Sequence, residues 1–144
     1  MITILTMIQD IIKIYSLPLS GWAVSKKKTV SLNMNWYRNA HFQVSNKIKK
    51  QVAEYLLKYT FQKYTSKIKI DFVLYFKDNR RRDVSNFESI ANKFILDALV
   101  DRGIILDDDF KHYPEYTVKY GGKADINAIT FQITEIGNKL NNIY

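Results

Sequence analysis

Residues 67–109 read KIKIDFVLYFKDNRRRDVSNFESIANKFILDALVDRGIILDDD, and this stretch decides the fold. Residues 67–76 are β-branched and aromatic, which is typical of a central strand. After a turn at 77–79, apolar residues recur at helical spacing and predict a helix over residues 85–102. They are Phe87, Ile90, Ala91, Phe94, Ala98 and Leu99. Gly103 follows as a suitable residue to end that helix.

The rest of the chain adds strands and one more helix around this unit. Alternation of apolar and polar residues predicts a strand at 29–36, with a loop bent by its asparagines as the alternative. Helical spacing predicts a helix at 45–62. We expect further strands at 11–17, 116–120 and 128–136, the last two forming a hairpin around 121–127. The order predicts one α+β domain over residues 1–144, with a small mixed sheet of about four to five strands packed against two main helices. Residues 1–6 and 137–144 are expected to lie outside the folded part.

The composition excludes several kinds of site. The 144 residues contain no cysteine and two histidines, so thiolate zinc sites, iron–sulfur centres and cysteine nucleophiles are ruled out. A bound metal would therefore have oxygen ligands and would be a hard cation such as Mg²⁺ or Mn²⁺. The sequence shows neither a membrane-spanning stretch nor a signal peptide. We expect a cytoplasmic protein.

Charge is distributed unevenly along the chain. The formal net charge is +8, but residues 1–82 hold 16 Lys and Arg against four acidic residues, whereas residues 83–144 hold six against ten. The first part is a candidate surface for a polyanion such as nucleic acid. The second part concentrates carboxylates, which a protein that holds a cation against phosphate requires.

The carboxylates form two groups, one on each side of the predicted helix. Asp83 precedes it, and residues 107–109 follow it. The two groups would meet only if the chain returns beside the helix after Gly103, because a helix of roughly 17 residues is about 25 Å long. Converging carboxylates need a cation between them, and Mg²⁺ on such ligands keeps positions for water and a phosphate oxygen. Lys93 would then stabilise charge on the scissile phosphate.

Purely structural interpretations of these residues also stand. Asp83 is suited to a helix start because of the helix dipole, and Ser85 with Glu88 has the spacing of a capping box. Lys93 and Asp97 are spaced as a surface ion pair. The run at 107–109 has the composition of a solvated turn.

The ordered motif in residues 80–109 resembles that of the RusA-like endonucleases, Holliday junction resolvases common in bacteriophages and prophages. That family shows a basic run, an Asp-x-Asp-Asn motif opening a helix, a lysine in the helix, an Asp-Ala-Leu, a glycine, an apolar pair and an Asp-Asp. The matching positions are Arg80, Arg81, Arg82, Asp83, Asn86, Lys93, Asp97, Ala98, Leu99, Gly103, Ile104, Ile105, Asp107 and Asp108.

The resemblance implies a homodimer in the bacterial cytoplasm that binds four-way DNA junctions and resolves them by paired, Mg²⁺- or Mn²⁺-dependent hydrolysis during recombination and repair. It implies metal ligation by Asp83 and Asp108, assistance from Asp107, and a catalytic role for Lys93. We expect a group of basic and polar residues to contact DNA phosphates. They are Arg80, Arg81, Arg82, Ser85, Asn86, Lys26, Lys27, Lys28 and Arg38.

Two positions depart from the family pattern. Ser85 stands where the family has its second Asp, and we hypothesise that Glu88 supplies the missing carboxylate to the metal. Lys93 comes about one helical turn later than the family's lysine. Two alternatives therefore remain beside the nuclease: a junction-binding protein without catalysis, and a phage regulatory module that binds a protein partner on the same scaffold.

Overall fold

The computed structural model describes residues 13–109, 111–113 and 115–136, and its α+β fold confirms the expected class. A four-stranded sheet has the order β1-β6-β4-β5, and β2 and β3 form a separate two-stranded sheet. The strands are β1 (Tyr15–Pro18), β2 (Trp22–Ala23), β3 (Thr29–Val30), β4 (Ile68–Phe76), β5 (Glu115–Lys123) and β6 (Ala128–Glu135). The helices are α2 (Met34–Asn39), α3 (Phe42–Leu56) and α4 (Val84–Asp101). The predicted tails, 1–6 and 137–144, lie outside the described residues, as do Ile11 and Ile12.

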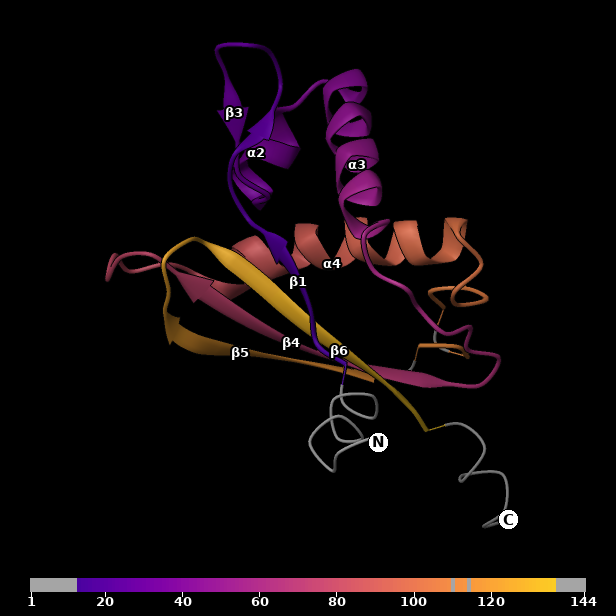
Figure 1. Ribbon diagram of the computed structural model, residues 1–144. Helices are drawn as coiled ribbons and strands as arrows, with labels where there is room; N and C mark the ends of the chain where they lie inside the picture. Colours follow the sequence, from indigo (N-terminus) through magenta and orange to yellow (C-terminus); the bar gives the residue numbers. More distant parts are fainter. Residues whose placement is uncertain (1–12, 110, 114, 137–144) are drawn as a thin grey trace, which may run out of the picture.

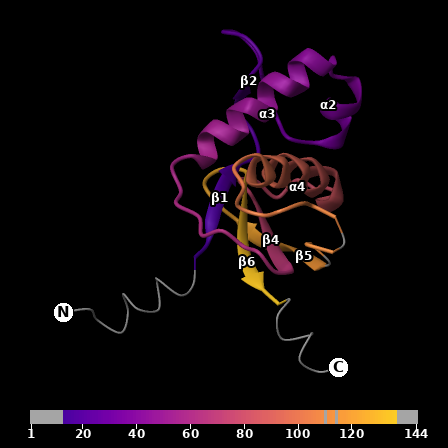
Figure 2. The ribbon, with the colours of Figure 1, turned by 90° about the vertical axis from the view of Figure 1, so that its right-hand side faces the viewer.

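The elements form layers (Figures 1 and 2). The four-stranded sheet lies at one side, α4 crosses one of its faces, and α2 and α3 lie on the far side of α4. This sandwiching explains why α4 is buried on most of its circumference, including Ile90, Ile95 and Leu99. A helix that is covered on two sides carries apolar residues over more of its circumference than a surface helix does.

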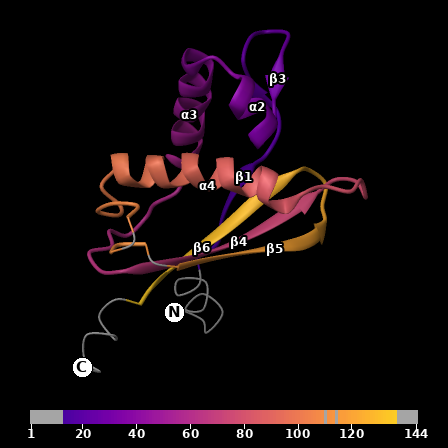
Figure 3. The same cartoon turned by 180° about the vertical axis from the view of Figure 1, so that it is seen from behind.

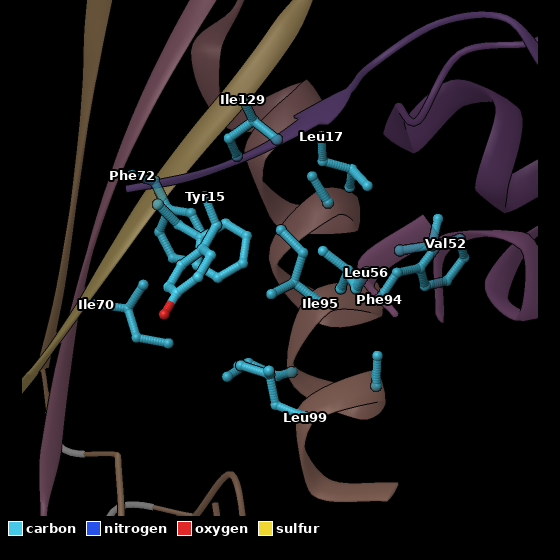
Figure 4. Packing of buried hydrophobic residues seen from close by; sticks show 14 of the residues in the cluster. Tyr15, Leu17, Val52, Leu56, Ile70, Phe72, Phe94, Ile95, Leu99 and Ile129 are labelled. Atoms are coloured by element: carbon cyan, nitrogen blue, oxygen red, sulfur yellow. The ribbon is translucent and has the colours of Figure 1, made fainter. Parts of the chain in front are cut away.

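Strand β4 is interior to the sheet, as its composition predicts. It runs antiparallel to β6 and parallel to β5. Every second side chain, including Ile70, Phe72 and Leu74, is buried on the face that α4 covers. Figure 4 shows this packing: Tyr15, Phe72 and Ile129 from the sheet meet residues of α4 such as Ile95, and Val52 and Leu56 of α3 approach α4 from its other side.

The ends of α4 confirm the predicted helix to within one residue. Asp83 is the N-cap, with its side chain accepting a hydrogen bond from the Ser85 amide. Gly103 has φ +71°, a left-handed conformation that favours glycine after a helix C-terminus. The other predicted helix, 45–62, begins earlier than expected, because the His41 ring caps α3 by accepting from the Gln43 amide, and it ends at Leu56.

Two predictions about the strands are wrong. Only Thr29–Val30 of the predicted strand 29–36 is a strand, because Asn33 caps α2 by accepting from the Trp36 amide at 2.8 Å. The two C-terminal strands do not form a hairpin, since β4 lies between them. The condition for the two acidic groups to meet is not fulfilled after Gly103: the chain does not run back along α4 there, Ile104 and Ile105 are buried in a turn, and the Ile104 carbonyl accepts from the Tyr64 amide.

Among the described residues, no helix combines the length and the apolar character that crossing a membrane requires.

Candidate nucleic-acid interface

A hollow of about 510 Å³ lies between α2 and the first turns of α4. Six of its seven lining residues are polar or charged; the seven are Met34, Asn35, Arg38, Asp83, Ser85, Asn86 and Ser89. The Asn86 side-chain oxygen accepts a hydrogen bond from the Met34 amide at 3.1 Å. Asn86 therefore holds the start of α2 against the start of α4, and four of the predicted site residues meet here: Arg38, Asp83, Ser85 and Asn86.

Asp83 presents an exposed carboxylate at the N-terminus of α4. One oxygen, Oδ1, accepts from the Ser85 amide at 3.1 Å and from the Ser85 hydroxyl at 2.8 Å. A negatively charged side chain at this position stabilises the helix, because the N-terminus of a helix carries partial positive charge. The capping-box interpretation is wrong: Asp83 is the cap and Ser85 is inside the helix.

Glu88 does not join this carboxylate. It is 5% exposed, lies outside the lining of the hollow, and accepts a hydrogen bond from the Asn92 side chain at 2.8 Å. Burial raises the pKa of the Glu88 carboxyl. Helical geometry explains the separation, because a residue five positions after Asp83 points to a different face of α4. Glu88 thus does not replace the carboxylate that Ser85 lacks within this hollow.

Lys93 is exposed on α4, one turn beyond Ser89 on the same helical face. Its alternative role as the partner of Asp97 is wrong, since Asp97 pairs with Lys49 of α3 at 3.1 Å. Ten residues separate Lys93 from Asp83, about 15 Å along the helix axis at 1.5 Å per residue. Lys93 therefore extends the polar face that begins at the hollow, without reaching Asp83 itself.

The acidic run at 107–109 lies beyond the other end of α4. Asp109 accepts from the amides of Lys111 and His112 and pairs with the His112 ring at 2.7 Å, which lowers the pKa of its carboxyl. Asp107 and Asp108 are exposed. Partial burial and the neighbouring Asp107 raise the pKa of the Asp108 carboxyl. Asp109 thus stabilises the turn, and Asp107 and Asp108 are the two carboxylates of this run that are exposed to solvent.

Within one chain these two acidic groups do not converge. The 18 residues of α4 lie between them, a length of about 27 Å. The described residues contain no group of three or more His, Asp or Glu side chains placed to hold a metal ion. The chain runs back toward the start of α4 only in β5, which lies in the sheet and begins at Glu115. Asp107 and Asp108 precede β5, so this strand does not carry them to Asp83.

The basic run beside Asp83 divides into two kinds of arginine. Arg82 is held by Asp78 through two hydrogen bonds, and its guanidinium lies 4.7 Å from the centre of the Phe76 ring. Arg80 and Arg81 are exposed: Arg80 Nε lies 3.8 Å from Asp78 Oδ2, a long ion pair, but the Arg80 side chain remains 79% accessible. Arg82 therefore shapes the loop, while Arg80 and Arg81 are available to a phosphate.

The remaining predicted lysines lie elsewhere. Lys26, Lys27 and Lys28 are exposed between β2 and β3. This connection is attached to α3, because the Lys47 ammonium donates to the Val24 carbonyl at 2.9 Å. They form a separate basic patch on the α2–α3 side of the molecule.

Several surface residues escaped the sequence interpretation. Ser89 and Asn35 line the hollow, and only the helical spacing from Ser85 to Ser89 could have indicated this. Tyr120, about half exposed, lies with Arg80, Arg81 and Arg82 around a second hollow of about 420 Å³ on the β5 side of the loop. The sequence signal for Tyr120 was its alternation with Tyr116 and Val118, which places these three side chains on one face of a strand.

A search of protein-family models finds no match for this chain, and a search of curated protein sequences finds none either.

Proposed function

We propose that this protein is a metal-dependent endonuclease that acts on branched DNA such as four-way junctions. The observation that carries the proposal is the shared hollow of Asp83 and Arg38, beside the exposed Arg80 and Arg81. Without a cation between them, the Asp83 carboxylate would repel a phosphate bound in the hollow, since like charges repel. A carboxylate beside arginines is what a divalent cation bridging protein and phosphate requires.

The donor set of the hollow fits a magnesium ion in the way such ions commonly bind. Mg²⁺ is usually held by one or two carboxylates, several waters and substrate phosphate oxygens. Asp83 would supply the carboxylate, and the Ser85 hydroxyl, 2.8 Å from that carboxylate, would orient bound water. When bound, such an ion would lower the pKa of an attacking water and offset charge on the phosphate.

The residues around the hollow have separate roles in this proposal. Arg38, Arg80 and Arg81 bind and orient the DNA phosphates, because guanidinium groups match phosphate geometry. Asn86 acts as a positioning residue by holding α2, which carries Arg38, against α4. Lys93 and the patch at Lys26, Lys27 and Lys28 extend the contact to more distant arms of a branched substrate.

A second candidate function has its own support. Among the residues that the structure describes, Asp83 supplies the only carboxylate that lines the hollow, and this favours a branched-DNA-binding protein without catalysis. Such a protein would bind strongly at low salt and lose affinity steeply as salt rises.

One experiment separates the two candidates. The purified chain is incubated with a labelled four-way junction and with a linear duplex of the same arm sequence, with and without Mg²⁺ or Mn²⁺. The nuclease predicts junction-specific nicks that require the metal and disappear in Asp83→Asn, while junction binding persists. The matched control is Asp125→Asn, an exposed carboxylate in the β5–β6 connection, which should nick normally. Binding without nicks in both metals would reject the nuclease.

A further inference from the structure

The second hollow, of about 420 Å³, lies at the end of the sheet where β4 leads into α4. Phe76, Val84 and Tyr120 give it apolar walls, and the loop between β4 and α4 adds three arginines, so we call it the aromatic hollow. Figure 3 shows that loop and the end of β5 at the same end of the sheet. None of the lining residues that the structure describes is acidic. The aromatic hollow thus differs from the hollow of Asp83, because it combines aromatic rings with positive charge and no carboxylate.

Phe76 forms a fixed floor for the aromatic hollow. It is 3% exposed, and the Phe87 and Tyr120 rings pack around it with their centres 5.1 and 6.1 Å away. The Arg82 guanidinium lies 4.7 Å from the centre of the Phe76 ring, and Asp78 holds that guanidinium through two hydrogen bonds. A site whose groups are already held in place loses little conformational entropy when it binds a ligand.

Tyr120 leans over this floor and keeps about half of its own surface exposed. In the register of the two parallel strands it lies beside Leu74, yet its ring stacks on Phe76, two residues further along β4, with 25° between the ring planes. The register shifts directly after Tyr120, so Gly121 has no partner on β4. Such bulges bend a strand and re-aim its side chains. Tyr120 is 52% exposed, so a ring backed by Phe76 is open to a flat ligand.

We propose that the aromatic hollow binds an unpaired nucleotide of the DNA substrate, with the base stacked on Tyr120 and the phosphate held by Arg80 and Arg81. Proteins that bind single-stranded nucleic acid combine aromatic side chains, on which bases stack, with a positively charged groove that follows the backbone. In a duplex each base is covered by its neighbours, so only a base that has left the stack can lie on such a ring. The inference rests on the DNA-binding part of the proposed function and is independent of catalysis.

The positive charge lies at the rim of the hollow, where a phosphate can reach it. Asp78 neutralises Arg82, whereas Arg80 and Arg81 are exposed and only Arg80 has a long contact to that carboxylate, at 3.8 Å. Guanidinium groups bind phosphate through paired, charge-assisted hydrogen bonds. The exposed Asn79 adds a side-chain amide, which can both donate to and accept from the edge of a base.

The two hollows adjoin at the start of α4. Arg82 and Val84 line the aromatic hollow, whereas Asp83, between them in the chain, lines the other one. Consecutive Cα atoms are about 3.8 Å apart, and consecutive nucleotides of one stacked strand are about 3.4 Å apart along the helix axis. A nucleotide bound in the aromatic hollow therefore brings a neighbouring phosphate of the same strand to Asp83.

This arrangement favours branch points over duplex DNA. Unpairing a base costs free energy, and the cost is least where the base is already unpaired. Stacking of one base on an aromatic side chain, measured by alanine substitution, contributes about 5- to 150-fold in affinity. We therefore expect a junction with one unpaired nucleotide at its branch point to bind more tightly than a fully paired junction with the same arms.

Binding measurements without a divalent metal test the stacking, because they do not require cleavage. The probes are a four-way junction with one unpaired thymidine at the branch point and the same junction fully paired, compared by fluorescence anisotropy in EDTA. The unmodified chain should bind the first junction at least about 5-fold more tightly. Tyr120→Ala should lose this preference, and Tyr120→Phe, which keeps the ring, should retain it.

Tyr116 provides the matched control variant. It alternates with Val118 and Tyr120 on one face of β5 and is 51% exposed, but it lies outside the aromatic hollow. Tyr116→Ala should therefore keep the preference for the unpaired nucleotide. Equal affinity of the unmodified chain for the two junctions, or an equal loss in Tyr116→Ala and Tyr120→Ala, would overturn the proposal.

Photocross-linking of the unmodified chain gives a readout that depends on no variant. Iodouracil, a base analogue that reacts on irradiation with aromatic side chains it touches, replaces the unpaired thymine, and the cross-linked residue is identified by mass spectrometry. We expect Tyr120, and cross-links only to residues outside the aromatic hollow would overturn the stacking.

The outcomes separate this inference from the nuclease. A preference for the unpaired nucleotide without metal-dependent nicks supports the aromatic hollow and rejects the nuclease. Nicks by a chain that shows no preference reject the aromatic hollow and support the nuclease. Failure to bind either junction would overturn both.

Discussion

The Arg82 guanidinium holds the Asp78 carboxylate through two hydrogen bonds, with Nη1 2.6 Å from Oδ1 and Nη2 3.2 Å from Oδ2. The same guanidinium covers the Phe76 ring at the end of β4. This bidentate pair closes the loop between β4 and α4, whereas Arg80 makes only a long contact to Asp78 at 3.8 Å and both Arg80 and Arg81 are exposed. Three consecutive arginines thus have two different roles, and the difference can be measured.

Removing the exposed arginines should weaken DNA binding without affecting the fold. The double variant Arg80→Ala/Arg81→Ala should reduce the slope of log affinity against log salt by about 2, because each lost phosphate contact removes roughly 0.9. The measurement is a salt titration by fluorescence anisotropy on a four-way junction, and the thermal unfolding midpoint should stay unchanged. An unaltered slope would place the phosphate contacts elsewhere.

Removing Arg82 should instead destabilise the protein. The pair with Arg82 holds the pKa of the Asp78 carboxyl well below its usual range. A carboxyl whose pKa is lowered by folding adds stability above its ordinary pKa, and this stability is lost as the pH falls through the folded pKa. Arg82→Ala should therefore unfold at a lower temperature than the unmodified chain at pH 7. The difference should shrink when the thermal scans are repeated at progressively lower pH, below about 4.

The buried Glu88 should make the protein less stable at neutral pH than at acid pH through its own ionisation. Burial raises the pKa of this carboxyl above its ordinary 4.5. A raised carboxyl pKa means that stability falls as the pH rises from the ordinary pKa through the folded one. Glu88→Gln, which can still accept from Asn92, should raise the unfolding midpoint at pH 8 and leave it unchanged at pH 4. The exposed Glu54→Gln is the control, and an equal gain for both variants would contradict the assignment.

Asp83 combines a cap with a charge, and two substitutions separate them. Asparagine caps a helix about as well as aspartate, whereas alanine costs about 1 kcal/mol. Asp83→Asn should therefore keep the free energy of unfolding within about 0.5 kcal/mol of the unmodified chain, and Asp83→Ala should lose about 1 kcal/mol. Urea denaturation measures both. A similar loss in both variants would show that the charge, not the cap, stabilises α4.

Gly121 allows β5 to approach β4 closely. A Cβ at this position would lie 2.5 Å from Val73 Cγ1 and from the Tyr75 ring. Gly121→Ala should therefore destabilise the protein by about 1–3 kcal/mol, as overpacking does. Val73→Ala removes one of the clashing atoms, so the double variant should lose less than the sum of the single losses in urea denaturation. Additive losses would argue against a contact between these residues.

The local sequence pattern was sufficient to predict β4 and α4. The apolar residues of β4 and α4, the anion at Asp83 and the stop at Gly103 depend on neighbours within a few positions, and the structure has all of them where the sequence predicts them. The same is true of the division between a basic and an acidic part, because it is a property of composition alone.

Contacts between residues far apart in the sequence determined the rest of the fold. Residues 29–36 alternate like a strand, yet Asn33 caps a helix there, and Asn86, 52 positions from Met34, holds its start. Strand β4 separates β5 from β6 because the most apolar strand takes an interior place in the sheet, which no hairpin signal reveals. Glu88 lies inward because packing, not sequence proximity to Asp83, determines which face of α4 is buried.

By itself, the sequence determined which residues carry charge and which segments repeat with the period of a strand or a helix, since these follow from covalent order. Only the tertiary structure decided that Asp83 and Asp108 lie at opposite ends of α4. The distance between them depends on the path of the chain after Gly103, which is set by the burial of Ile104 and Ile105 and by the parallel pairing of β4 with β5. Those are cooperative, long-range energies, and no local pattern encodes them.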